Sequence, residues 1–118
     1  AIADFTNSLA RPEGVIDPTV YADRAEAYTA LGKYADAVND YSSAVRVISE
    51  QIQGAPSMDE REALSNKAMG YFEKSAALNV NLGNMDAARS DLESARTIGA
   101  ALGDGETVER LDKLLAEQ

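Results

Sequence analysis

Two short clusters of carboxylates are the strongest candidates for chemistry in this sequence. The first is Asp59, Glu60 and Glu62, and the second is Asp104, Glu106 and Glu109. Closely spaced carboxylates serve as general acids and bases, or ligate hard cations such as calcium. Each cluster, however, follows a helix-breaking stretch, where Asp and Glu stabilise the start of the next helix. Neither has the long, ordered run of oxygen ligands that an EF-hand needs. We therefore expect both clusters to cap helices.

Other routes to catalysis are closed by composition. The 118 residues include no His and no Cys, which removes the commonest general base, the thiol nucleophile and the usual zinc ligands. The sequence also has no glycine-rich phosphate loop and no serine nucleophile elbow. It predicts a protein that is not an enzyme and that needs no cofactor and no metal.

The charge balance limits the classes of partner. The formal net charge is −9, with 45% hydrophobic residues, which is typical of one acidic globular domain. Such acidity argues against nucleic acid and against anionic membrane surfaces, because phosphate binding depends on Lys and Arg. It serves either solubility or a basic partner surface. No apolar run reaches the roughly 20 residues that span a bilayer, so no membrane insertion is expected. The compartment stays open, with the cytoplasm or another internal soluble compartment such as the plastid stroma as the expectation.

Helix-breaking residues divide the chain into segments with helical spacing of apolar residues. Asp17-Pro18 has the form of a helix start, and Gly32, Gly83 and Gly103 stand where a helix would end. Ser57 begins a capping box after a further break at 54–56. Strand-like alternation is missing, so the sequence predicts an all-α fold. The expected helices are 1–11, 18–31, 34–52, 58–82, 85–102 and a shorter one at 106–116.

A pattern of small and aromatic residues recurs along the chain. Its first occurrence is Tyr21, Ala25, Tyr28, Gly32, Tyr34, Ala37, Tyr41 and Ala44. Moved on by 51 residues, it becomes Phe72, Ala76, Asn79, Gly83, Met85, Ala88, Leu92 and Ala95. Only Asn79 breaks the match, because it replaces an aromatic residue. Alanines allow helices to approach closely, while the tyrosines fill the flanking grooves and the glycine permits a sharp reversal. We expect these positions to form the core.

This pattern resembles the tetratricopeptide repeat, a helix-turn-helix unit of 34 residues. The segment 18–51 matches one repeat, 69–102 a second, and 1–12 the second helix of a truncated repeat. The resemblance implies antiparallel helix pairs stacked as a short right-handed superhelix, with 106–116 as a capping helix. Residues 52–68 depart from the family as an insertion, and the spacings of 36 and 51 exceed 34. The chain is therefore expected to be a fragment of a longer array, or to carry an unstructured N-terminal part.

The insertion at 52–68 is expected to lengthen both helices of a hairpin instead of forming a loose loop. The hairpin would then project beyond the stack. Its tip serves either as an extra docking surface or as a structural spacer, and the sequence does not choose between them.

The resemblance also implies where a partner would bind. In this family the first helix of each pair lines a concave surface that holds extended peptides or helices. The matching positions are Thr19, Ala22, Glu26, Thr29 and Ala30 in one pair, and Gly70, Glu73, Ala77, Val80 and Asn81 in the next. Only Lys74 is basic there, which argues against the family's clamp for a terminal carboxylate. A small, partly acidic groove would suit a helix or a peptide with Lys or Arg, unless Glu26 and Glu73 are simply solvated.

Two functions from different classes are compatible with these residues. One is a non-catalytic protein-protein interaction module, an adaptor or assembly-factor scaffold that binds a peptide or helix of a partner protein. The other is a structural subunit permanently incorporated in a larger protein complex. An acidic mimic of nucleic acid would need a regular stripe of charge, whereas the acidic residues are dispersed.

Overall fold

The computed structural model describes residues 18–116, and this part of the chain is all-α. Helix makes up 89% of it, with no strand in that range. The helices are α2 (Pro18–Ala30), α3 (Tyr34–Gly54), α4 (Met58–Asn81), α5 (Met85–Leu102) and α6 (Gly105–Ala116). The five predicted helices from 18 to 116 are confirmed to within two residues at each end. The helix expected at 1–11, the segment 1–12 and the cap Asp17 lie outside the described residues.

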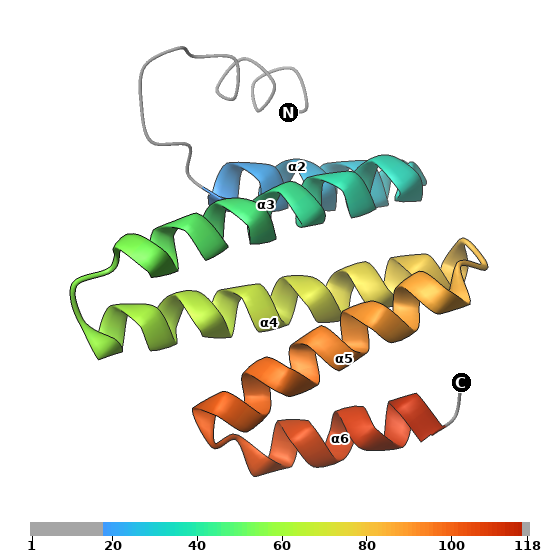
Figure 1. Ribbon diagram of the computed structural model, residues 1–118. Helices are drawn as coiled ribbons and strands as arrows, with labels where there is room; N and C mark the ends of the chain where they lie inside the picture. Colours follow the sequence, from blue (N-terminus) through green and yellow to red (C-terminus); the bar gives the residue numbers. More distant parts are fainter. Residues whose placement is uncertain (1–17, 117–118) are drawn as a thin grey trace.

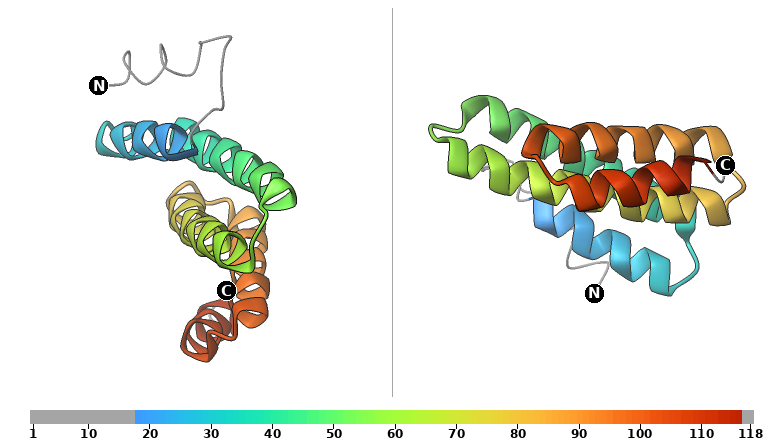
Figure 2. Two further views of the ribbon diagram at one scale, coloured as in Figure 1. Left: turned by 90° about the vertical axis from the view of Figure 1, so that its left-hand side faces the viewer. Right: turned by 90° about the horizontal axis from the view of Figure 1, so that it is seen from below.

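The helices form two layers (Figures 1 and 2). Each helix packs antiparallel against the helix that follows it, so that α2, α4 and α6 lie in one layer and α3 and α5 in the other. One broad face is therefore built by α2, α4 and α6 together.

Three of the reversals between helices have the same backbone geometry. Gly32, Gly83 and Gly103 have φ angles of 76°, 78° and 73°, in the left-handed region that glycine enters at little cost. In each turn the backbone amide of the residue after the glycine donates to the carbonyl five residues earlier, at 2.8–2.9 Å. This bond satisfies a carbonyl that the helix end leaves open. The three glycines thus perform the reversal that their spacing predicted.

Replacing Gly83 by alanine is expected to lower the free energy of unfolding by about 1–2 kcal/mol, the cost of left-handed backbone for an L-residue. A Cβ atom there would meet nothing within 4 Å, so the backbone carries the whole effect. Gly70→Ala is the matched control, because Gly70 lies inside α4 and also has open space around it. It should gain about 0.5–1 kcal/mol. Urea denaturation measures both, and shifts of equal sign would contradict the assignment.

The core is built where small residues let two helices approach. Ala25, Ala37 and Ala44 have no exposed surface, and Tyr41 is 3% exposed between them. Ala88 and Ala95 are equally enclosed, as is Ala76 at 2%. The aromatic partners Tyr21, Tyr28, Tyr34 and Phe72 are half-buried, and Leu92 is buried. The alanine positions, Tyr41 and Leu92 are therefore confirmed as core, with the half-buried aromatic rings at the edges of the alanine contacts. The expectation is wrong for Met85, which is 51% exposed at the start of α5.

The hairpin of α3 and α4 is longer than its neighbours and projects beyond them (Figure 2, right). Only residues 55–57 separate the two helices, so residues 52–68 extend α3 and α4 and do not form a loose loop. The Ser57 hydroxyl accepts the Glu60 amide at 3.2 Å, and the Arg61 Nε donates to the Ala55 carbonyl at 3.3 Å. The predicted cap at Ser57 is thus confirmed, and the hairpin end is held closed.

Asp104 of the second acidic cluster caps a helix, as predicted. Asp104 precedes α6, where its carboxylate accepts the Thr107 amide at 3.2 Å and the Thr107 hydroxyl at 2.6 Å. These hydrogen bonds lower the pKa of Asp104. The carboxylate therefore remains charged at the N-terminus of α6, where the helix dipole favours it.

Candidate functional site

In each described hairpin that has a left-handed glycine turn, a carboxylate on the second helix links the two helices. Arg24 donates to Asp40 through Nε at 2.7 Å and Nη2 at 2.5 Å, and Arg96 pairs with Asp112. In the middle hairpin the Ser75 hydroxyl and the Asn79 amide donate to Asp91, at 2.7 and 2.9 Å. Arg24, Ser75 and Arg96 each lie 16 residues before their carboxylate. Asn79 is thus explained: it replaces an aromatic residue because it helps to hold Asp91.

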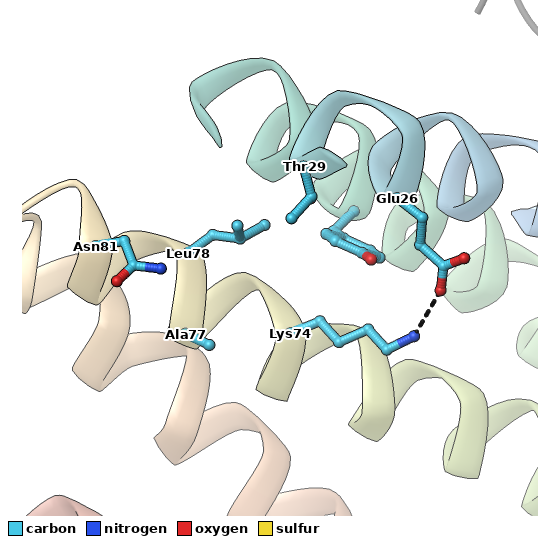
Figure 3. A pocket seen from close by; sticks show the side chains of 7 residues that line it. Glu26, Thr29, Lys74, Ala77, Leu78 and Asn81 are labelled. Atoms are coloured by element: carbon cyan, nitrogen blue, oxygen red, sulfur yellow. Dashed lines mark hydrogen bonds and ion pairs between the residues drawn. The ribbon is translucent and has the colours of Figure 1, made fainter. Parts of the chain in front are cut away.

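A cavity of about 370 Å³ opens on the broad face between α2 and α4 (Figure 3). Its lining comes from α2, from α3 and from four positions of α4: Glu26, Thr29, Tyr41, Lys74, Ala77, Leu78 and Asn81. At one side the Lys74 ammonium donates to the Glu26 carboxylate at 3.0 Å, across the gap between the helices. This hydrogen bond raises the pKa of Lys74. The two opposite charges therefore neutralise each other at the rim.

A second cavity of about 250 Å³ opens on the other side of α4, toward α6. Residues of α4, α5 and α6 line it: Glu73, Ala76, Ala77, Val80, Leu92, Arg110 and Leu114. Here too a cation and an anion on neighbouring helices are paired, since Arg110 donates to Glu73. The hydrogen bond with Glu73 raises the pKa of Arg110. Ala77 lines both cavities, so the two hollows adjoin each other across α4.

The two cavities are built from corresponding positions. Tyr41 of the first and Leu92 of the second are 51 residues apart, which is the spacing of the small-aromatic pattern. On the opposite walls, Lys74 corresponds to Arg110 and Leu78 to Leu114, each 36 residues apart. The same local packing therefore produces one hollow on each side of α4.

Few polar groups in these cavities remain open to a ligand. The four charged side chains are engaged in the two ion pairs. The Thr29 hydroxyl donates to the Ala25 carbonyl at 2.8 Å within α2. Among the described lining residues, the Tyr41 hydroxyl and the exposed Asn81 amide are left, and both belong to the first cavity. Burial raises the pKa of Tyr41, so its hydroxyl stays protonated at neutral pH.

Most of the binding positions expected from the sequence lie at these cavities. Four line the first cavity, and three line the second, Ala77 being common to both: Glu26, Thr29, Ala77 and Asn81, then Glu73, Ala77 and Val80. Thr19 and Gly70 are half-buried and line neither cavity, and Ala30 is exposed at the end of α2. The expectation that Ala22 faces the groove is wrong. It is 6% exposed within the α2–α3 core, because the close approach of the helices covers it.

Two further expectations differ from the observed site. Glu26 and Glu73 are each paired with a cation on the next helix of the layer, so they leave the groove less acidic than expected, although the Glu26 side chain stays 59% exposed to solvent. Arg110 and Leu114 form a wall of the second cavity, although the sequence assigned α6 only a covering role. A signal for this was present: both residues repeat the α4 positions of Lys74 and Leu78 at a constant spacing.

Between 18 and 116 there is no group of three or more acidic side chains placed to hold a metal ion. No helix of that range is long and apolar enough to cross a bilayer. Compared with known proteins, the chain matches no family model, no curated protein and no solved structure.

Proposed function

We propose that this chain is a non-catalytic protein-interaction module of the tetratricopeptide type, which binds a segment of a partner protein across α2, α4 and α6. The observation that carries this proposal is the pair of adjoining cavities on one face, each built from corresponding positions of successive hairpins. Hollows with mostly apolar walls and a charged rim are typical of sites that bind protein segments. The module would act as an adaptor or assembly-factor scaffold.

A photo-crosslinking amino acid placed at Ala77 tests this function, because Ala77 is exposed and lines both cavities. The same group at Ala101, which is exposed on α5 in the other layer, is the matched control. Irradiation in an extract of the source cells should join position 77, and not position 101, to one discrete partner segment identified by mass spectrometry. Equal labelling from both positions, or none from position 77, would contradict the proposal.

A second candidate function is a structural subunit held permanently in a larger complex, and one surface favours it. Leu31, Leu82 and Met85 are 63%, 38% and 51% exposed. They lie at the α2–α3 and α4–α5 turns, which share one edge of the molecule (Figure 1). A permanent interface would cover such an apolar edge. The same crosslinker at Leu82 distinguishes the candidates: strong labelling from position 82 with none from position 77 would favour the subunit.

A further inference from the structure

We infer that the partner segment is an α-helix that inserts two uncharged side chains from one of its faces, an aromatic one into the α2–α4 cavity and an aliphatic one into the α4–α6 cavity. This inference rests on the proposed function and specifies its ligand. Three features of the groove lead to it: the state of its polar groups, the position of Ala77, and the difference between the two cavities.

The engaged polar groups favour a helical ligand over an extended one. An extended peptide leaves its own amides and carbonyls open, and these need partners in the groove when they lose water. Here the two ion pairs and the intrahelical bond of Thr29 occupy five of the seven polar side chains of the lining. An α-helix satisfies its own backbone and requires from the groove mainly room for apolar side chains. The groove supplies that room.

The position of Ala77 lets one ligand helix reach both cavities. Ala77 lines both of them, so the cavities adjoin each other across α4. Side chains three, four or seven residues apart lie on the same face of an α-helix, so one face can supply both inserted side chains. The small side chain of Ala77 lets the ligand cross α4 without a clash.

The lining determines which side chain enters which cavity. The first cavity is the larger, and it alone presents free polar groups, the Tyr41 hydroxyl and the Asn81 amide. An aromatic side chain with a polar edge, such as Tyr or Trp, suits it. The second cavity is smaller and has aliphatic walls from Val80, Leu92 and Leu114. Since each rim already holds one cation paired with one anion, a charged side chain would find no open counter-charge at either place.

A display library of helix-forming peptides with randomised exposed positions provides the probe. The full chain is the bait, and its Ala77→Arg variant, which fills the point shared by both cavities, is the counter-selection. The enriched sequences should share an aromatic and an aliphatic residue on one helix face, three, four or seven residues apart. Enrichment of peptides with one anchor, with anchors on different faces or with internal prolines would overturn this inference and leave the proposed function standing. No enrichment over the Ala77→Arg variant would overturn both.

The best enriched peptide is then titrated against variants at three neighbouring exposed positions, which tests the two cavities separately. Val80→Arg blocks only the second cavity, Asn81→Arg blocks only the first, and Leu82→Arg reaches neither. We expect the first two to weaken binding by about tenfold or more, and Leu82→Arg by less than about twofold. A peptide whose aromatic anchor is changed to alanine should lose its sensitivity to Asn81→Arg and keep its sensitivity to Val80→Arg. The reverse pattern, or a dominant effect of Leu82→Arg, would overturn the assignment. Circular dichroism confirms that each variant is folded.

Discussion

Replacing Leu111 by alanine is expected to lower the free energy of unfolding by about 2–5 kcal/mol, the range for a large core side chain that leaves a cavity. Leu111 has no exposed surface and packs in the cluster that holds Met69, Leu92 and Ala95. Because α6 packs mainly against α5, the loss should fall first on α6. Urea denaturation measures the total effect. Amide hydrogen exchange should show α6 opening before the other helices.

Leu114→Ala is the matched control for this prediction. Leu114 lies on the same helix, one turn after Leu111, and is 38% exposed. Its removal should cost no more than about 1 kcal/mol, because less of its surface leaves water on folding. It should nevertheless weaken binding of an aliphatic anchor, since Leu114 lines the second cavity. Equal loss of stability in the two variants would show that α6 is not anchored through Leu111.

Removing the Asp40 carboxylate should have the second large effect. Asp40 is 3% exposed, and Asp40→Ala would leave the guanidinium of Arg24, which is 18% exposed, without its bidentate partner. Breaking a buried ion pair costs about 3–5 kcal/mol, and because Arg24 is partly exposed we expect a loss of unfolding free energy at the lower end, about 3 kcal/mol. The rings of Tyr21 and Tyr28, about 6 Å from the guanidinium, would compensate only in part for the lost ion pair. Thermal and urea denaturation measure the change.

Asp112→Ala tests whether burial, and not the bond itself, sets this cost. Asp112 pairs with Arg96 at the same spacing of 16 residues, but the two side chains are 49% and 44% exposed. Exposed ion pairs contribute about 0–1 kcal/mol, so the free energy of unfolding of this variant should remain close to that of the parent protein. Equal losses of unfolding free energy in Asp40→Ala and Asp112→Ala would show that burial does not strengthen the Arg24–Asp40 pair.

Local chemistry made the helices and the core predictable from the sequence. Gly32 and Gly83 mark reversals because left-handed backbone is strained for other residues, and Ser57 marks a helix start because its hydroxyl replaces a missing acceptor. Ala25 and Ala37 could be placed in the core because a small residue repeated at helical spacing serves close packing. These inferences depend on residues near one another in the chain, and the structure bears them out.

The ion pairs and the walls of the cavities depend on distances across helices, which the sequence pattern does not supply. Glu26 and Lys74 are 48 residues apart, and Glu73 and Arg110 are 37 apart, so nothing local marks them as partners. The misplacement of Ala22 has a similar origin, because a shift of one position around a helix decides between core and surface. By contrast, the recurring carboxylate that links the two helices of a hairpin could have been predicted from Asp40 and Asp91, which are 51 residues apart.

Each described helix packs mainly against its neighbours in the sequence, and this has a mechanical consequence. Pulled from its two ends, such a chain has no central joint that must break before anything else can move. Tension would instead peel the outermost described helix away and pass to its neighbour, so the molecule would lengthen in a series of small steps. A tether built this way yields gradually under load, and it can recover each step by laying one helix back on the surface that remains.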